Sequence, residues 1–219
     1  YENATGTNQI FSVPQTLSNI TRNLSLNLSI PSKSFNDKIR EKIVQLHYYL
    51  GIEANDIRTT QGGEYFIPFS FYESTAPNYI HFIIILIILF ALIVKRLKIN
   101  RMPMIYFISL IIGFLLFSIF LKWQPYGSRL MLPLFVLSSP IVSLVLSKIN
   151  LEKILPLIIL IISINAMPYI LMNKSRPLLG TISLSKTGSF YKLDYPDWSK
   201  KNRDELYFVR KPEYYNIYK

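Results

Sequence analysis

Apolar and polar positions divide the chain into three parts. Residues 1–77 and 173–219 are mainly polar, whereas residues 78–172 contain four long apolar blocks. Each block approaches the roughly 17 to 25 residues that a membrane-spanning helix needs. The blocks cover about residues 79–94, 104–121, 130–147 and 154–172. The pattern predicts an all-α membrane protein with about four transmembrane helices between a small N-terminal module and a C-terminal tail.

Two different periodicities occur within the first 77 residues. In NLSLNLSIP (Asn23–Pro31) apolar and polar residues alternate, which predicts a short strand or extended segment outside the bilayer. From Ser34 the apolar residues recur at helical spacing until Gly51, which predicts an amphipathic helix with a glycine stop. Residues 51–68 predict a loop with a turn at Gly62 and Gly63. Together these elements predict a module of α/β type.

The distribution of cations predicts the orientation in the membrane. KRLKINR, between the first and second apolar blocks, carries Lys95, Arg96, Lys98 and Arg101 and no acidic residue. The loop between the second and third blocks holds only Lys122 and Arg129. Because loops rich in Lys and Arg remain in the cytoplasm, we expect KRLKINR there. The Arg129 loop, the N-terminal module and the tail are then extracytoplasmic, in a multi-pass protein of the cell membrane.

The net charge and the lack of cysteine restrict the kinds of molecule that the protein is expected to bind. The 219 residues carry a formal net charge of +11 and no cysteine, which excludes disulfides and thiolate metal sites and favours anionic partners such as lipid head groups. Aromatic residues alternate with Lys and Arg in the tail, a pattern that could stack on nucleobases. The expected extracytoplasmic side argues against nucleic acid, and packing or sugar stacking is the prediction instead.

The segment KWQPYGSRLMLPLFVLSSP (Lys122–Pro140) carries the strongest candidate chemistry. A polar loop runs into an apolar helix that Pro133 and Pro140 are expected to break. A guanidinium at the mouth of a membrane helix either anchors in the head-group layer or binds a phosphate. Both interpretations of Arg129 stay open at this point, although prolines favour a helix that lines a cavity.

A second candidate segment, FYESTAPNYIH (Phe71–His81), precedes the first apolar block. Glu73 and His81 could act as acid and base or bind a metal. Alternatively Glu73 stabilises the start of the helix and Asn78 is a loop residue. The spacing is not a zinc pattern, so no metal site is predicted and no cofactor is assigned. The predicted substrate-binding residues are Arg129, Lys122, Gln124, Tyr126, Glu73 and His81.

These segments carry a resemblance to a known family. Together with RNLSLNLSIPS (residues 22–32) and LGIEANDIRTT (residues 50–60), they resemble the C-terminal half of prokaryotic GT-C glycosyltransferases. SRPLLG (residues 175–180) and RDELYFVRKPEYYNIY (residues 203–218) extend the resemblance into the tail. It implies transfer of a sugar from a lipid-linked sugar phosphate, with a polyprenyl tail, to an acceptor at the outer face. Arg129 would then bind the donor phosphate.

The resemblance also implies where the catalytic carboxylate lies. In GT-C enzymes it belongs to the first outer loop, near the N-terminus of the full protein. We therefore expect this chain to be the C-terminal portion of a longer protein, with its catalytic residues upstream. The alternative is a non-catalytic membrane protein, such as an assembly or transport component, which needs no acidic outer loop.

Overall fold

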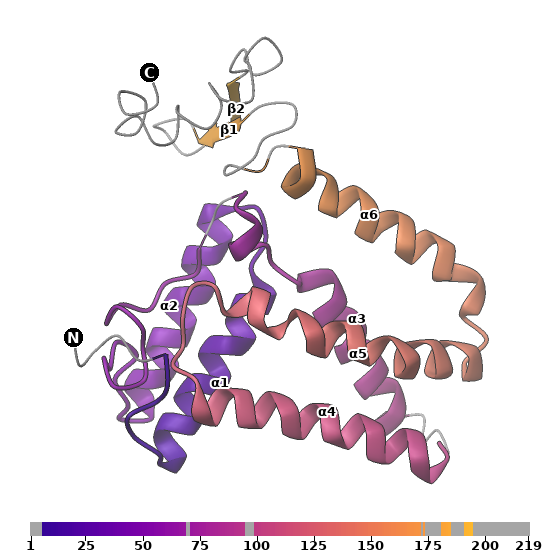
Figure 1. The fold of residues 1–219 in the computed structure, drawn as a ribbon, viewed down its shortest axis with the longest axis horizontal. Helices are drawn as coiled ribbons and strands as arrows, with labels where there is room; N and C mark the ends of the chain where they lie inside the picture. The colour runs from indigo at the N-terminus through magenta and orange to yellow at the C-terminus, as the bar shows by residue number, and fades with distance from the viewer. Residues whose placement is uncertain are drawn as a thin grey trace, which may run out of the picture. The chain divides into compact units, whose positions relative to one another are not determined.

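The computed structural model describes residues 6–68, 71–94, 99–171 and 173, together with two short strands. The chain forms two compact units, one of residues 1–70 and 74–164 and the other of residues 71–73 and 165–219. The elements are shown in Figure 1: α1 (Val13–Leu28), α2 (Lys33–Tyr49), η2 (Glu73–Thr75), α3 (Tyr79–Val94), α4 (Arg101–Phe120), α5 (Gly127–Lys148), η3 (Glu152–Ile154), α6 (Leu155–Leu171), β1 (Thr181–Leu184) and β2 (Tyr191–Asp194).

Helices α3 to α6 coincide with the four predicted apolar blocks, and α2 with the predicted amphipathic helix, so these helix predictions are confirmed. The strand predicted at Asn23–Pro31 is wrong, because α1 continues to Leu28. A nine-residue window fitted a period of two, whereas apolar residues over the whole of α1 recur at 3.6. In the described part of residues 1–77, strand-like pairing is limited to isolated bridges, so the α/β module is not observed.

Local signals explain where the helices begin and end. The Ser12 side chain accepts a hydrogen bond from the Gln15 amide at 3.5 Å, and a proline occupies the first turn of α1. At the end of α2, Gly51 has φ of 65° and its amide donates to the Tyr48 carbonyl, while Ile52 donates to His47. This Schellman motif requires a left-handed residue, which explains the glycine.

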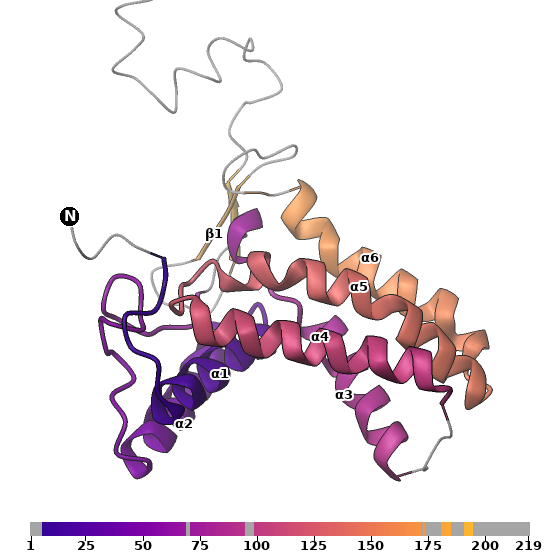
Figure 2. The ribbon, with the colours of Figure 1, turned by 60° about the horizontal axis from the view of Figure 1, so that its bottom comes forward.

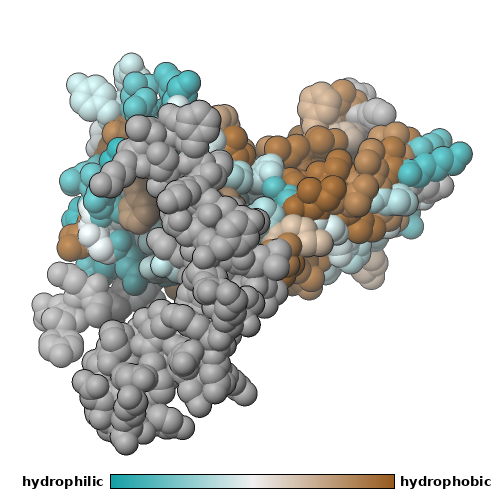
Figure 3. All heavy atoms as spheres, turned by 90° about the horizontal axis from the view of Figure 1, so that it is seen from above, coloured by the Kyte–Doolittle hydropathy of each residue, from teal (hydrophilic) through white to brown (hydrophobic). Residues whose placement is uncertain are grey.

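Two helices, α4 and α5, are long and apolar enough to cross a membrane by length and composition. In their most apolar stretches only 11% and 33% of the residues are buried, unlike the core helices of a soluble protein. Helices α3 and α6 are apolar but shorter. On the face drawn in Figure 3, hydrophobic side chains form a continuous area on one part and hydrophilic ones gather mainly on another. These features point to a membrane.

Packing in the first unit centres on α5. Helices α3 and α4 each pack along α5, and Figure 2 shows α4 and α5 side by side. The helix runs without interruption from Gly127 to Lys148, so the expected break at Pro133 and Pro140 is not observed. The Tyr106 hydroxyl of α4 donates to the Leu137 carbonyl at 2.6 Å, in the turn before the second proline. Contacts with neighbouring helices therefore support the proline-containing turns.

The N-terminal module, which we define as residues 6–68, packs α1 against α2, α3, α4 and α5. The fully buried ring of Tyr65 in this module packs against the equally buried Trp123 of the loop before α5, with the ring centroids 5.1 Å apart. In the second unit, β1 and β2 pair antiparallel with Thr181 opposite Asp194. The remaining residues of the predicted C-terminal tail lie outside the described part of the chain.

Candidate functional site

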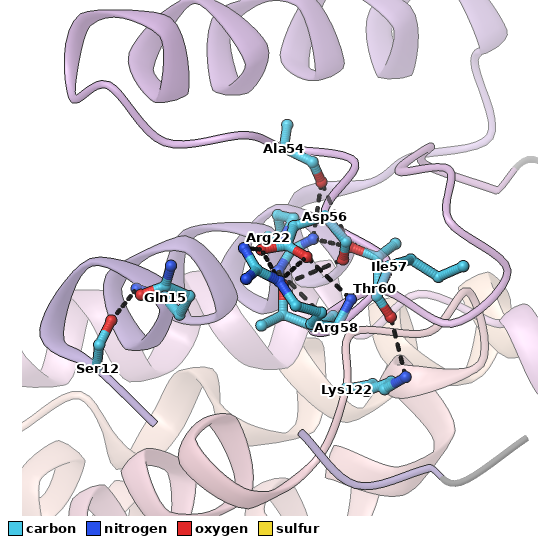
Figure 4. Close-up of polar contacts among 10 residues, drawn as sticks. Ser12, Gln15, Arg22, Ala54, Asp56, Ile57, Arg58, Thr60 and Lys122 are labelled. Carbon is cyan, nitrogen blue, oxygen red and sulfur yellow. Dashed lines mark hydrogen bonds and ion pairs between the residues drawn. The ribbon is translucent and has the colours of Figure 1, made fainter. Parts of the chain in front are cut away.

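The polar face of α1 is buried, and Arg22 lies at its centre with no solvent-exposed surface. Its guanidinium donates to the Asn19 side-chain oxygen at 2.5 Å, the Ala54 carbonyl at 2.7 Å and the Thr59 hydroxyl at 2.9 Å. It also donates to the Thr60 hydroxyl. Figure 4 shows the side chain reaching from α1 into the loop after α2, to which Ala54 and Thr60 belong. Burial lowers the pKa of Arg22 to about 10. These bonds fasten α1 to the loop after α2.

The nearby carboxylate of Asp56 is engaged by a different arginine. Arg58 donates to its two oxygens at 2.9 Å and 2.8 Å, which lowers the pKa of Asp56. Arg22 is therefore held by neutral oxygens, in an arrangement that fixes loop geometry rather than one that moves protons.

His47 of α2 forms a second buried contact with α1. Its Nδ1 lies 2.7 Å from the Ile43 carbonyl and its Nε2 lies 2.8 Å from the Ser18 hydroxyl. Because a carbonyl only accepts, Nδ1 carries the proton and Nε2 accepts from Ser18. Burial lowers the pKa of His47, which favours this neutral form. The histidine is thus a structural bridge between α1 and α2.

Asparagines of the N-terminal module also satisfy the end of α4. The last carbonyls of a helix have no partner within it, and in a membrane environment each needs a donor. Asn8 donates through its side chain to the carbonyls of Ser118 and Ile119, at 3.2 Å and 2.7 Å, and through its backbone to Phe120 at 2.8 Å. Asn19 donates to Ser118 and Leu121. All four terminal carbonyls are therefore paired.

The predicted residues of the loop before α5 have different environments. Lys122 is only 2% exposed, and its ammonium donates to the Ile57 carbonyl at 2.9 Å (Figure 4). Gln124 and Tyr126 form the turn that leads into α5, where their carbonyls accept the amides of Gly127 and Arg129. The side chains of Tyr126 and Arg129 are exposed. Of the two predicted cations, only Arg129 is presented at the surface.

The segment Phe71–His81 contacts the start of α5 through Asn78. Asn78 donates to the Ser128 carbonyl at 2.8 Å and to the Asn27 side-chain oxygen at 3.4 Å, so it joins α3, α5 and α1. His81 is half-buried on α3, with its ring 6.1 Å from that of Phe135. Glu73 lies in η2, and its side chain is outside the described part.

An apolar groove runs between α3 and α4, with α5 as its floor and α1 at its end. It encloses about 350 Å³ and arises because α3 and α4 pack against α5 but hardly against each other. Leu86 and Ile111 are exposed on its walls, so the groove opens to the surroundings. The lining residues are Leu24, Asn27, Phe82, Ile85, Leu86, Leu89, Phe107, Leu110, Ile111, Phe114, Met131, Leu134, Phe135 and Ser138.

Polar groups contribute little to the groove surface. The Asn27 amide donates to the Asn23 carbonyl at 3.0 Å, and the Ser138 hydroxyl donates to Phe135 at 2.7 Å. A hydrocarbon guest therefore meets carbon along most of the wall, with the Asn27 and Asn78 amides near one end. A volume of about 350 Å³ falls within the range of ligand pockets.

The apolar groove, and the hydrogen bonds by which Arg22 joins α1 to the loop after α2, were not predicted from the sequence. A usable signal existed for Arg22, since the polar residues of α1 recur at helical spacing, but the groove depends on the packing of three separate helices. Within the described residues, no three His, Asp or Glu side chains come together as a metal site. No protein-family model, curated protein or solved structure matches the chain.

Proposed function

We propose that the chain is a segment of a multi-pass membrane protein in which α3, α4, α5 and α6 cross the bilayer. The apolar surface of α4 and α5 supports this proposal. With 16 and 17 residues, α3 and α6 are about 24 to 26 Å long, close to a hydrocarbon core of about 30 Å. The basic KRLKINR segment supports a cytoplasmic position for the loop between α3 and α4, and both ends of the chain would then lie outside.

Cysteine labelling tests this orientation. The chain has no cysteine, so a single substitution provides the only reactive thiol. Tyr126 is half exposed in the loop before α5, and Tyr126→Cys is expected to react with a membrane-impermeant maleimide added outside intact cells. Labelling of Tyr126→Cys only after the cells are opened would contradict the orientation.

As the activity we propose sugar transfer from a polyprenyl-phosphate donor to an acceptor at the outer face, as in GT-C glycosyltransferases. The observation that carries this proposal is the apolar groove, which suits a hydrocarbon tail. The groove ends at α1, where Asn27 is the polar residue of its lining. The donor tail lies in the groove, and the sugar phosphate emerges near the start of α3 and α5. Among the predicted residues, His81 is in ring contact with a residue that lines the groove, Phe135.

Arg129 is proposed as the phosphate ligand because its guanidinium is exposed at the start of α5. It precedes Met131, a groove residue, by two positions, or about 200° around the helix axis. The side chain therefore starts on the far side of α5 and reaches the phosphate only over the first turn of the helix. A charge-assisted bond formed in this way neutralises the departing phosphate.

A non-catalytic lipid-binding component of a membrane assembly is the second candidate. Two observations favour it: none of the residues that line the groove carries a carboxylate, and the Lys122 ammonium is occupied by the Ile57 carbonyl. A base for sugar transfer has to come from elsewhere under the first proposal and is not needed under the second.

Groove binding is tested with undecaprenyl phosphate as the probe and the chain in lipid nanodiscs. Leu110→Trp fills the groove, whereas Ile112→Trp places the same ring on an exposed part of α4 as a matched control. We expect Leu110→Trp to weaken binding about tenfold or more, equivalent to about 1.4 kcal/mol, and Ile112→Trp to leave it unchanged. Equal affinities for both variants would overturn the groove as the binding site.

The enzymatic step has a separate readout. Because the first proposal takes its catalytic base from outside this chain, membranes containing the protein together with any sequence that its gene encodes before Tyr1 are supplied with labelled undecaprenyl-phosphate hexoses. Transfer is compared between the wild type and Arg129→Ala. We expect Arg129→Ala to lose transfer, and to lose affinity for undecaprenyl phosphate but not for the uncharged alcohol undecaprenol. Unchanged transfer excludes the phosphate role of Arg129, and probe binding without any transfer selects the non-catalytic candidate.

A further inference from the structure

Helix α1 is inverted with respect to the usual amphipathic helix. Its apolar residues Val13, Leu17, Ile20, Leu24 and Leu28 follow the spacing of one helix face, which we name the α1 stripe. Val13 and Leu17 are 74% and 45% exposed, whereas the polar residues opposite the stripe are buried. Those buried polar residues are Ser18, Asn19, Arg22, Asn23 and Ser25, and one apolar residue, Leu26, is buried among them.

A helix in water normally buries its apolar face and exposes its polar one. Single exposed apolar side chains are common on soluble proteins, but a stripe along four turns of one helix marks an interaction surface. The surroundings of α1 are therefore apolar on the stripe side.

Helix α2 provides a comparison within the same module. It is nearly as long as α1, with 17 residues against 16. Its exposed positions include Lys38, Glu41 and Lys42, as expected for a helix in contact with water. In α1 the sole charged residue is Arg22, and it points inward. The outward-facing part of α1 carries no formal charge.

Thr21, a polar residue at the edge of the stripe, has its hydroxyl satisfied within the helix. The Thr21 hydroxyl donates to the Leu17 carbonyl at 3.0 Å and the Ser18 carbonyl at 2.9 Å. Such backbone bonding by threonine removes a donor that would otherwise seek water. This arrangement permits contact with hydrocarbon at low cost.

The α1 stripe is continuous with the apolar surface of the candidate membrane helices. Leu24 is part of the lining of the groove between α3 and α4. Phe11, just before α1, packs its ring against that of Phe120 at 6.0 Å, and Phe120 is itself exposed at the end of α4. Figures 1 and 2 both show α1 beside this end of α4. A surface that contacts acyl chains along α4 therefore extends onto α1.

We propose that α1 lies in the membrane interface at the Phe120 end of α4, with the stripe in contact with the acyl chains of bilayer lipids. The protein seals the polar face of α1, and lipid covers the opposite face. The N-terminal module is then partly embedded in the membrane, with α2 on its water-facing side. This placement does not depend on the proposed activity.

Spin labelling in a naturally cysteine-free chain tests the placement directly. Single-cysteine variants Val13→Cys and Leu17→Cys carry the nitroxide on the stripe, and Lys42→Cys carries it on α2 as the control. All three positions are exposed, so the label displaces no buried side chain. The full chain is reconstituted in phosphatidylcholine vesicles, and Trp123 fluorescence checks that each variant retains its fold.

The readout is collision of the nitroxide with oxygen, which concentrates in the bilayer, and with a water-soluble nickel chelate. Labels at Val13 and Leu17 are expected to favour oxygen, and the label at Lys42 to favour the nickel chelate. If the stripe labels meet the nickel chelate as often as the Lys42 label does, α1 faces water and the proposal fails. If they meet neither reagent, protein covers the stripe and the proposal also fails.

Discussion

Replacing Arg22 by alanine tests whether the buried polar face of α1 holds the N-terminal module together. Besides its bond to the Thr60 hydroxyl, the guanidinium makes three charge-assisted bonds of 2.5 to 2.9 Å, to Asn19, Ala54 and Thr59. Hydrogen bonds to a charged group contribute about 1.5 to 3 kcal/mol each. The three bonds together therefore stabilise the module by several kcal/mol before the cost of burying the charge is counted.

The cost of burial can be read from the pKa of Arg22. Burial lowers this pKa, the nearby Tyr65 and Asp56 raise it, and the net fall from 12.5 to about 10 corresponds to a net cost of about 3 kcal/mol for the charged form. In addition, the Thr59 hydroxyl keeps its own bond to the Asp56 carbonyl, at 3.3 Å, after the arginine is removed. We therefore expect Arg22→Ala to lower the free energy of unfolding of the module by about 3 kcal/mol.

The measurement is urea unfolding in detergent, followed by the emission of Trp123. The chain has two tryptophans, so a Trp198→Phe background leaves Trp123 as the sole reporter. Lys42→Ala is the control, because Lys42 is an exposed cation of α2 whose ammonium donates to the exposed Gln45 side chain; we expect it to leave the unfolding midpoint unchanged. Arg22→Lys should recover only part of the loss, since an ammonium lacks the planar fork.

The reasoning is refuted if Arg22→Ala and Lys42→Ala unfold at the same urea concentration. That result would mean that the desolvation of Arg22 cancels its hydrogen bonds, and that apolar packing around Trp123 and Tyr65 alone stabilises the module.

Two further predictions concern pH and backbone conformation. Because the pKa of folded His47 is below 6.5, the unfolded chain binds a proton more readily, so stability falls as the pH decreases below 6.5 towards the lowered pKa. His47→Gln should remove this dependence, measured as unfolding midpoints at about pH 7.5 and about pH 5.5, and an equal dependence in both proteins would contradict the assignment. Gly51→Ala should destabilise α2 by about 1 kcal/mol, because φ is 65° there. Gly6→Ala, at a position with open space, should have no effect on thermal unfolding, and equal melting of the two variants would contradict the strain at Gly51.

The sequence contained the information for five of the six α-helices in the described part of the chain. Residues 79–94 match α3 at both ends, because a continuous apolar block of this length has few alternatives to a helix. The helix that stops at Gly51 was predicted from side-chain period and glycine alone, since both signals act within a few residues.

The sequence was misleading where a local pattern competed with a longer one. The alternation in Asn23–Pro31 favours a strand, yet the full α1 repeats at helical spacing. Burial of Ser, Asn and Arg on one face of α1 becomes favourable only when the loop after α2 and the end of α4 supply partners for them.

Tertiary structure alone decided the candidate site. Asn8 and Asn19 satisfy carbonyls at the end of α4 that lie about a hundred positions away in sequence. Lys122 was predicted to bind substrate, but it is buried and its ammonium donates to the Ile57 carbonyl. The groove exists because α3 and α4 both pack on α5 and leave space between them. Local composition determines which segments become apolar helices, whereas contacts between distant segments determine which of their faces meet lipid, protein or a ligand.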